Sequence, residues 1–330
     1  MALCIGYVLV NGPRVPQMNT TPQVLVRRPV WAAWPAVSPR WLGVLAVLLF
    51  AMTIPMTRLA NGSVELPQLP PLFVAVGRGA IAGLLAMAYL WTVRASRPVK
   101  AQWPLLAAVV LGAVLIFPLC MGWAVRVVPA AHAAVIVGLL PLCTAALASW
   151  WLGQRPGWAF WVAGAVGSAL VLMFALGVAR AHGADHWVSA DAWLVVSMLG
   201  ASVAYVAGAA LSRQMPAAQA ISWALVAALP ITLPATAWAW PTEAVSWQAW
   251  GALAYVAVIS TWLGFFAWYA ALACDPMRVS QLQLMQPFTS IALSVLVLHE
   301  AVDASTWLVA GAVLLVVIWG QRAARREMKR

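Results

Sequence analysis

The sequence predicts an all-α polytopic membrane protein with ten transmembrane helices, built as two inverted five-helix repeats. Three observations lead to it: ten long apolar runs between Trp41 and Gly320, a composition that is 64% hydrophobic and 8% charged, and matched residues in the two halves of the chain. A helix needs about 20 apolar residues to cross a hydrocarbon core about 30 Å thick. A soluble chain of 330 residues could not bury ten such runs in its core.

The ten predicted helices follow from hydropathy and length. Few of the runs carry a charge, and short polar, proline or glycine segments separate them. Strands of a membrane barrel would alternate polar and apolar residues over about ten positions, whereas segments 108–116 and 310–318 are apolar on every face. We therefore predict helices at residues 41–59, 72–93, 103–125, 130–152, 158–178, 190–212, 218–239, 248–273, 279–298 and 304–320.

These helices divide the chain into five parts. Residues 1–40 are rich in proline and arginine and are predicted to form a poorly ordered cytoplasmic tail. Residues 41–178 form the first repeat and residues 190–320 the second. A periplasmic linker at 179–189 joins the repeats, and residues 321–330 form a basic cytoplasmic tail.

Lysine and arginine gather in the segments that a cytoplasmic N-terminus would place on the cytoplasmic side. With that orientation, fifteen of the 19 basic residues lie inside, and six of the eight acidic residues lie outside. Cytoplasmic loops of membrane proteins carry such an excess of positive charge. We therefore expect a multi-pass protein of the cell (inner) membrane, embedded in the lipid bilayer with both termini in the cytoplasm.

Composition and motifs exclude several other classes. The formal charge of +11 does not indicate nucleic-acid binding, because most basic residues lie between apolar runs or at the chain ends. Cys4, Cys120, Cys143 and Cys274 stand far apart and form no metal-binding spacing. Phosphate-loop, dinucleotide and zinc-protease motifs are lacking as well. We expect no cofactor, no metal and no enzymatic activity.

The two halves of the chain match at corresponding positions. Pro141 aligns with Pro287 at an offset of 146 residues, and Gln154 aligns with Glu300 at the same offset. One residue later, the pentapeptide VAGAV recurs at 162–166 and 309–313. Because five is odd, the second set of five helices must enter the membrane from the opposite side. Secondary transporters use inverted repeats of this kind, with the substrate site between them.

Longer segments around these positions carry a family resemblance. The first half reads PAAHAAVIVGLLP at 129–141 and LGQRPG at 152–157, and the second reads DPMRVSQLQLMQP at 275–287 and LHEAV at 298–302. A small-residue start to the fourth helix, a central proline and a following Gly-Glu-Arg-like turn are features of the EamA-type ten-helix exporters. Over about 41–320, the chain resembles these members of the drug/metabolite transporter (DMT) superfamily.

The resemblance implies a carrier in which helices one to four and six to nine enclose a cavity, while the fifth and tenth lie outside. It also implies transport of a small organic metabolite. The family's usual Glu before the first proline is Leu140 here, and the Glu of the turn is Gln154. If those carboxylates couple ions in relatives, the first half lacks them, whereas Gln286 and Glu300 keep the polar character in the second.

The predicted ninth helix has a polar face that could line a cavity. Its members recur at intervals of three or four residues and so share one helical face; they are Ser280, Gln283, Gln286, Ser290 and Ser294. In hydrocarbon a polar side chain needs a partner, so this face meets either a cavity or another helix. Glutamine amides both donate and accept hydrogen bonds, which suits a zwitterionic or neutral polar solute.

Other polar and aromatic residues inside the predicted helices are candidates for the same cavity. Arg78 could hold a substrate carboxylate, or extend to the outer headgroups. His132 could take a proton or serve as a hydrogen-bonded helix residue. Tyr205 and Trp262 could stack on an aromatic solute or pack in the core. Thr53 could line the cavity or bond to its own helix.

Pro55, Pro141 and Pro287 lie inside predicted helices, where each removes a backbone hydrogen bond and kinks the helix. They are candidates for gate hinges, with a static bend as the alternative. Gly79 and Gly83, one turn apart, permit close helix contact. That contact lies either within the chain or between two copies, so a homodimer is one possible assembly.

The sequence therefore predicts a transporter that moves a small-molecule substrate by alternating access between the two repeats. Amino acids or related compounds are the first expectation, and export is the expected direction. A channel-like or structural membrane protein is the alternative. An intramembrane enzyme is less well supported, because we expect His132 and His299 to lie at opposite faces of the membrane.

Overall fold

The computed structural model describes residues 39–151, 157–182, 185–274 and 282–327. These residues are almost entirely helical, and within those ranges the only β-pairing is an isolated bridge between Gly62 and Pro67. The helices of the first half are α1 (Pro39–Ala51), α2 (Thr53–Asn61), α3 (Pro71–Thr92), η2 (Lys100–Gln102), α4 (Trp103–Val109), η3 (Val110–Ile116), α5 (Phe117–Val127), α6 (Ala130–Val137), α7 (Leu140–Trp151) and α8 (Trp158–His182). Those of the second half are α9 (Asp185–Leu211), α10 (Ala217–Trp238), α11 (Trp247–Ala254), η4 (Tyr255–Leu263), α12 (Gly264–Cys274), η5 (Gln283–Met285), α14 (Gln286–Leu298) and α15 (Ala304–Glu327).

Eight helical stretches in the described residues are long and apolar enough to cross a bilayer, which agrees with a polytopic membrane protein. They match the first eight predicted helices and cover Trp41–Asn61, Pro71–Thr92, Lys100–Val127, Ala130–Trp151, Trp158–Gly177, Trp187–Leu211, Ala217–Trp238 and Trp247–Ala271. The last two predicted helices correspond to shorter apolar helices, Gln283–Leu298 and Ala304–Gly320. The all-helical expectation is confirmed, while the count of ten crossings stays a prediction.

Two segments placed outside the predicted transmembrane helices are largely helical where the structure describes them. α8 continues to His182 and α9 begins at Asp185, so most of the predicted linker at 179–189 belongs to these two helices. α15 likewise continues to Glu327, into the predicted basic tail. Positive side chains near a helix C-terminus interact favourably with the helix dipole, which favours this extension. The predicted tail at 1–40 lies outside the described residues except for its last two positions.

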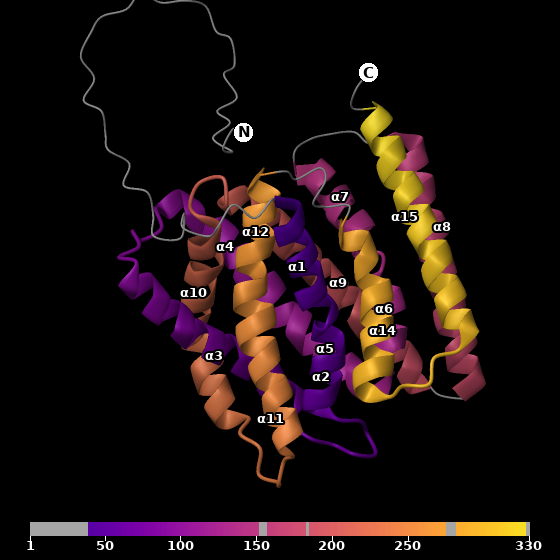
Figure 1. Cartoon of the computed structure of the whole chain (residues 1–330), viewed down its shortest axis with the longest axis horizontal. Coiled ribbons are helices and arrows are strands. Elements are labelled where there is room, and N and C mark those ends of the chain that lie inside the picture. Colours follow the sequence, from indigo (N-terminus) through magenta and orange to yellow (C-terminus); the bar gives the residue numbers. More distant parts are fainter. Residues whose placement is uncertain (1–38, 152–156, 183–184, 275–281, 328–330) are drawn as a thin grey trace, which may run out of the picture. The chain divides into compact units, whose positions relative to one another are not determined.

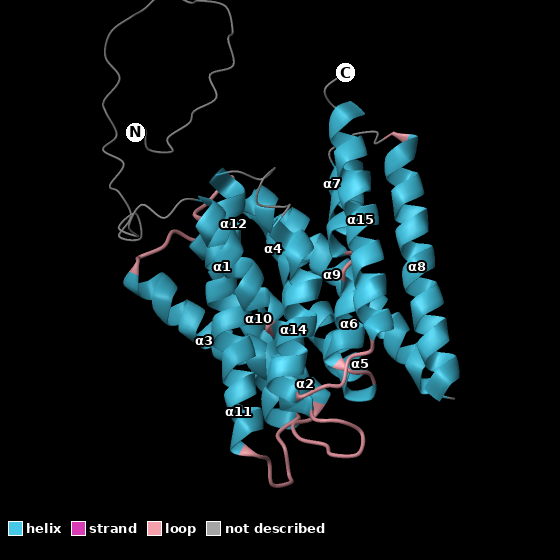
Figure 2. Ribbon diagram, turned by 45° about the vertical axis from the view of Figure 1, so that its right-hand side comes forward, coloured by secondary structure: helices cyan, strands magenta, loops and turns pink. Residues whose placement is uncertain are grey.

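Helices of the first half pack against helices of the second half. α3 packs along α10, α1 along α12, α5 along α9, α6 along α14 and α8 along α15. Figure 1 shows α8 and α15 side by side at one edge of the bundle, and α1 beside α12. The two halves are therefore interleaved, and the interior of the bundle is formed by their shared interface (Figure 2).

Glycines allow a close contact between α3 and α10. A Cβ atom added to Gly83 would lie 2.6 Å from Cδ2 of Leu229, and one added to Gly79 would lie 3.1 Å from Cγ2 of Thr232. Backbones that approach this closely gain van der Waals contact, the main attraction between helices in a bilayer. The expectation that Gly79 and Gly83 mediate helix packing is thus confirmed.

The three prolines predicted to kink helices each follow a break in a helix. Pro55 lies in the first turn of α2, after the interruption at Met52. Pro141 is the second residue of α7, after the break that ends α6, and Pro287 is the second residue of α14, after η5. Proline has no N–H to donate to the preceding turn, so the helix is interrupted just before it.

Two π-helical segments interrupt the apolar helices at matched positions. η3 lies between α4 and α5, and η4 lies between α11 and α12. η4 covers the positions that follow η3 by 146 residues, the separation that relates Pro141 to Pro287. π-helical turns inside α-helices are frequent at functional sites, and both of these segments contribute residues to the cavity described below.

Candidate functional site

A small cavity between the two halves contains Arg78. Its volume is about 30 Å³, which is room for one or two water molecules. The polar residues of its lining are Thr53, Arg78, Ser260 and Gln286. The aromatic residues are Phe50, Phe117, Tyr205 and Phe265, and the other lining residues are Ile54, Ala113, Val137, Leu140 and Ala201.

Arg78 projects from α3 and is only 2% exposed. Its Nε donates a hydrogen bond to Oγ1 of Thr261 at 2.7 Å, and its Nη2 donates to Oγ of Ser260 at 3.4 Å. Its Nη1 has no hydrogen-bond partner. The guanidinium also lies 6.0 Å from the ring centroid of Phe117, within cation–π range. The alternative that Arg78 extends to the headgroups is excluded by this burial.

Hydroxyl groups on η4 and α2 hold the arginine in place. Thr261 donates its own proton to the carbonyl oxygen of Val256 at 2.7 Å, so its lone pairs are left for Arg78. Ser260 is hydrogen-bonded to Thr53 across an Oγ–Oγ1 distance of 2.7 Å. Thr53 therefore connects the first half of the chain to the second, and the side chain of Arg78 is fixed at two of its nitrogens.

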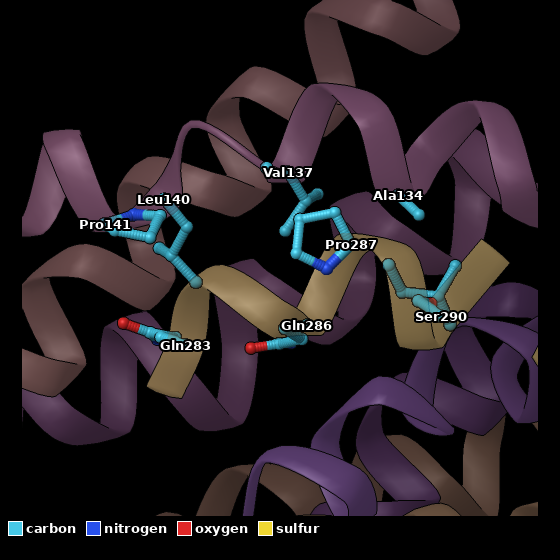
Figure 3. Close-up of a pocket in the computed structure, with 10 residues that line it drawn as sticks. Ala134, Val137, Leu140, Pro141, Gln283, Gln286, Pro287 and Ser290 are labelled. Atoms are coloured by element: carbon cyan, nitrogen blue, oxygen red, sulfur yellow. The ribbon is translucent and has the colours of Figure 1, made fainter. Parts of the chain in front are cut away.

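A second, smaller cavity of about 10 Å³ adjoins the first, and the two share Gln286, Ile54, Val137 and Leu140. It also contains Gln283, Ser290, Pro141 and Pro287 (Figure 3). Nε2 of Gln283, Oε1 of Gln286 and Oγ of Ser290 are buried without hydrogen-bond partners. Buried polar atoms normally find partners, so these three atoms are available to a ligand.

Aromatic rings form one wall of the Arg78 cavity. The ring of Phe50 lies 5.1 Å from that of Phe265 and 6.4 Å from that of Tyr205, and the rings of Tyr205 and Phe265 are 6.0 Å apart. These distances are within the range of favourable aromatic pairs. The cavity therefore has a cationic and hydroxyl side and an aromatic side.

Most of the residues predicted to line a cavity meet at these two cavities. Thr53, Arg78 and Tyr205 line the first, Gln283 and Ser290 line the second, and Gln286 lines both. Two of the predicted hinge residues, Pro141 and Pro287, line the second cavity as well, whereas Pro55 does not. Ser280 lies outside the described residues.

His132 and Trp262 line neither of these cavities. Nε2 of His132 is 2.7 Å from Oδ1 of Asp191, and its ring stacks on that of Phe174. Nε1 of Trp262 donates to Oγ of Ser222 at 3.0 Å. Both residues therefore take the alternative structural role that the sequence allowed.

Polar contacts tie the halves together at the end of the bundle where α6 begins. The carboxylate of Glu300 accepts hydrogen bonds from the backbone N–H groups of Ala130 at 2.8 Å and Ala131 at 3.0 Å. At the same end, within the first half, Arg58 of α2 donates to the carbonyl oxygen of Val125 in α5. The placement of His132 and His299 at opposite faces was wrong: Glu300, next to His299, binds the first turn of the helix that carries His132.

Several residues that line the Arg78 cavity or hydrogen-bond to Arg78 were not predicted from the sequence. Ser260 and Thr261 stand side by side in the middle of the predicted eighth helix, and polar side chains at that depth need partners. This signal could have found them. Phe50, Phe117 and Phe265 had no such signal, because a phenylalanine in an apolar helix is equally suited to lipid, core or cavity.

Comparison with known proteins gives three findings. The model of the EamA-like transporter family matches the chain twice, at residues 39–176 and 188–319. A protein of Bacillus subtilis (strain 168), described as the uncharacterized transporter YdeK, is 40% identical over 296 residues, which is 88% of this chain and 98% of that protein. A crystal structure with 17% sequence identity aligns with a TM-score of 0.60 over 87% of this chain and 98% of its own, which supports the fold.

Proposed function

The chain belongs to the EamA-like transporter family, and we propose that it carries small organic metabolites by alternating access between two inverted five-helix repeats. The observation that carries this proposal is the double family match, which places one copy of the family unit on each half of the chain. The Arg78 cavity and its smaller neighbour lie where those two copies meet. We assign the substrate to these cavities.

The packing of the helices supports the repeat. If the first five transmembrane helices correspond to the last five, then the contacts α3–α10, α6–α14 and α8–α15 each join a helix to its own counterpart. The same correspondence relates the helix of α1 to that of α9 and the helix of α5 to that of α12, so the contacts α1–α12 and α5–α9 are equivalent. The matched π-helices η3 and η4 fit it as well. Because five is odd, the second copy of five helices enters the membrane from the opposite side. The two copies together make ten crossings.

The size of the cavities supports alternating access. Sites for small organic ligands commonly have volumes of about 300–1,000 Å³, whereas the two cavities here measure about 30 and 10 Å³. A metabolite can therefore enter only if helices move apart. The breaks before Pro55, Pro141 and Pro287 are the positions at which the helices bend most easily, and the Glu300 contacts close one end of the bundle.

The lining supports amino acids or related compounds as the cargo. A charged donor at Arg78 and a free acceptor at Gln286 are both present, and the wall of Phe50, Tyr205 and Phe265 is apolar. In a mostly apolar site, a small number of polar groups is enough to fix the orientation of a ligand. The distribution of positive charge supports an inner-membrane carrier with cytoplasmic termini, and we propose export as its direction.

Transport by the purified protein in proteoliposomes tests this function. We expect saturable uptake of at least one labelled amino acid or amphiphilic organic compound. The Gln286→Ala variant should lose most of that uptake, because it removes the acceptor shared by both cavities. The matched control is Gln248→Ala, an exposed residue at the start of α11. Uptake that rises linearly with concentration would instead indicate a channel.

The same vesicles test energy coupling. The acidic residues of the chain lie near the ends of the predicted helices or in loops, so the proposed mechanism has no proton relay through the bundle. We expect uptake to persist when the proton gradient is dissipated. Uptake that collapses with the proton gradient, but not when only the voltage is clamped, would contradict the facilitated mechanism.

A further inference from the structure

Arg78 is a buried cation to which the described residues supply no acidic partner. Its hydrogen-bond acceptors, Thr261 and Ser260, are neutral hydroxyl groups. Among the described side chains, the ion pair found is that of His132 with Asp191, and it lies elsewhere. An arginine keeps its charge in a protein, and an unpaired charge inside a membrane is costly. The charge of Arg78 is therefore left for a ligand to neutralise.

Arg78 lines the cavity, and one nitrogen of its guanidinium is left without a partner. Nε is held by Thr261, whereas Nη1 is buried and has no partner. Because Thr261 and Ser260 fix the rest of the group, the N–H bonds of Nη1 are oriented before a ligand arrives. Such preorganisation lowers the entropic cost of binding. An anionic oxygen that enters this cavity would meet unpaired donors from a positive group.

The surroundings favour a carboxylate over a phosphate. The planar guanidinium matches a planar carboxylate and forms strong charge-assisted hydrogen bonds with it. A phosphate monoester carries a charge of about −1.5 to −2 at neutral pH, while Arg78 is the one cationic residue that lines either cavity. The remaining walls are aromatic, aliphatic or neutral polar groups, so a single negative charge is the one that this site can balance.

We propose that Arg78 is a substrate-binding residue that holds a carboxylate of the cargo and makes the protein select organic carboxylates over their neutral analogues. This inference rests on the proposed function, because it concerns the cavity assigned to the substrate. The carboxylate binds at Nη1 of Arg78, the acceptor Oε1 of Gln286 takes a donor group of the same molecule, and the aromatic wall contacts its apolar part.

Ligand-induced stabilisation of the full-length protein in detergent tests the proposal without requiring transport. The probes are matched pairs in which only the charge differs: phenylalanine with phenylalaninamide, and benzoate with benzamide. Benzylphosphonate serves as the phosphate-like member. We expect at least one acid to raise the melting temperature with an affinity about tenfold to a hundredfold above that of its amide, the range for a hydrogen bond to a charged group. The phosphonate should bind no better than the amides.

Substitutions then assign the effect to Arg78. In Arg78→Gln the preference for the acid over the amide should disappear. In Arg78→Lys the preference should be reduced but retained, since lysine keeps the positive charge but lacks the planar guanidinium that binds a carboxylate through two N–H groups. The matched control is Arg126→Gln, a half-buried arginine of α5 that lines neither cavity. It should keep the full preference. If Arg78→Gln does not fold, the wild-type pairs and Arg78→Lys decide the matter.

Three outcomes would overturn the proposal: equal or absent stabilisation by acids and amides in the wild type, a preference that survives in Arg78→Gln, or a preference for the phosphonate. None of these outcomes contradicts the proposed transport function. That function is contradicted only if reconstituted vesicles show no saturable uptake of any solute. Saturable uptake of phenylalaninamide equal to that of phenylalanine would support the transport function but contradict the proposed role of Arg78. The two failures are therefore distinguishable.

Discussion

Glu300 caps the helix that begins at Ala130, although 170 residues separate them in the chain. One carboxylate oxygen accepts the N–H of Ala130, and the other accepts the N–H of Ala131. The first N–H groups of a helix have no partner within the helix, and a negative charge there is favoured by the helix dipole. A residue of the second half thus completes a helix of the first.

Replacing Glu300 should loosen this contact. In Glu300→Ala we expect a loss of about 1 kcal/mol of stability, the usual cost of a missing helix cap, and Glu300→Gln should lose less because its amide oxygen still accepts one hydrogen bond. Thermal unfolding in detergent measures both. Glu243→Ala, which changes an exposed loop glutamate, is the control. Equal melting temperatures for Glu300→Ala and Glu243→Ala would show that the cap contributes nothing.

His132 and Asp191 should stabilise the protein as a pair. Both are largely buried, and their side chains are 2.7 Å apart. Removing one partner leaves a buried polar group unsatisfied, which costs about 1–3 kcal/mol. A double-mutant cycle with His132→Ala and Asp191→Ala should therefore give a coupling energy within about 0.5–3 kcal/mol.

The control for this cycle uses a second histidine and aspartate. His299 and Asp303 are both exposed and lie four residues apart in sequence. The cycle with His299→Ala and Asp303→Ala should give no coupling beyond the error of the measurement. A coupling energy as large as that of His132 with Asp191 would mean that burial of the His132–Asp191 contact does not strengthen it.

Thr261 should act on substrate affinity through Arg78. Thr261→Val keeps the shape of the side chain and removes the acceptor of the Arg78 Nε–H, so the guanidinium loses its orientation. We expect the KM for a carboxylate substrate to rise about tenfold, equivalent to about 1.4 kcal/mol, with little change for the matching amide. Thr261→Ser should restore the wild-type KM.

The matched control is Thr236→Val. Like Thr261, Thr236 donates a hydrogen bond to a backbone carbonyl oxygen, that of Thr232, but it is not one of the hydrogen-bond acceptors of Arg78. This variant should keep the wild-type KM. A purely structural role of Thr261 would instead change acid and amide uptake alike, and that result would remove Thr261 from substrate binding.

Cysteine labelling tests the inverted arrangement. Single cysteines at Glu65 and Arg213 follow the first and sixth helices, which correspond if the chain is a repeat, and both positions are exposed. In a background without the four native cysteines, a membrane-impermeant maleimide should label Glu65→Cys from outside intact cells. Arg213→Cys should react only after the membrane is opened. Labelling of both from the same side would contradict the inversion.

Much of the fold was predictable because spanning a bilayer is a local property of a segment. Length and apolar composition located the helices, and within the described residues eight of the ten predicted segments are long and apolar enough to span. The ends were less predictable, since α8, α9 and α15 extend beyond the apolar runs that marked them in the sequence. The breaks at Pro55, Pro141 and Pro287 were predictable because proline lacks an N–H.

The site was predictable only in part. Arg78 and Gln286 were identified because charged and polar groups inside a membrane are rare and need partners. His132 has the same signal, yet it pairs with Asp191 away from the cavity. Ser260 and Thr261 were not predicted, although two adjacent hydroxyl residues at that depth indicate a buried polar contact; the geometry of η4 decides that this contact is with Arg78.

By itself, the sequence determined that the protein is a helical membrane protein, because hydrophobic length is a property of each segment, and its motifs identified the resemblance to EamA-type transporters. Only the tertiary structure decided which side chains meet. Helices that are apolar on every face carry no stripe that marks a partner, and lipid is as apolar as the interior of the bundle. Their facing is set by close packing, and that packing brings Arg78 to Thr261 and Glu300 to Ala130.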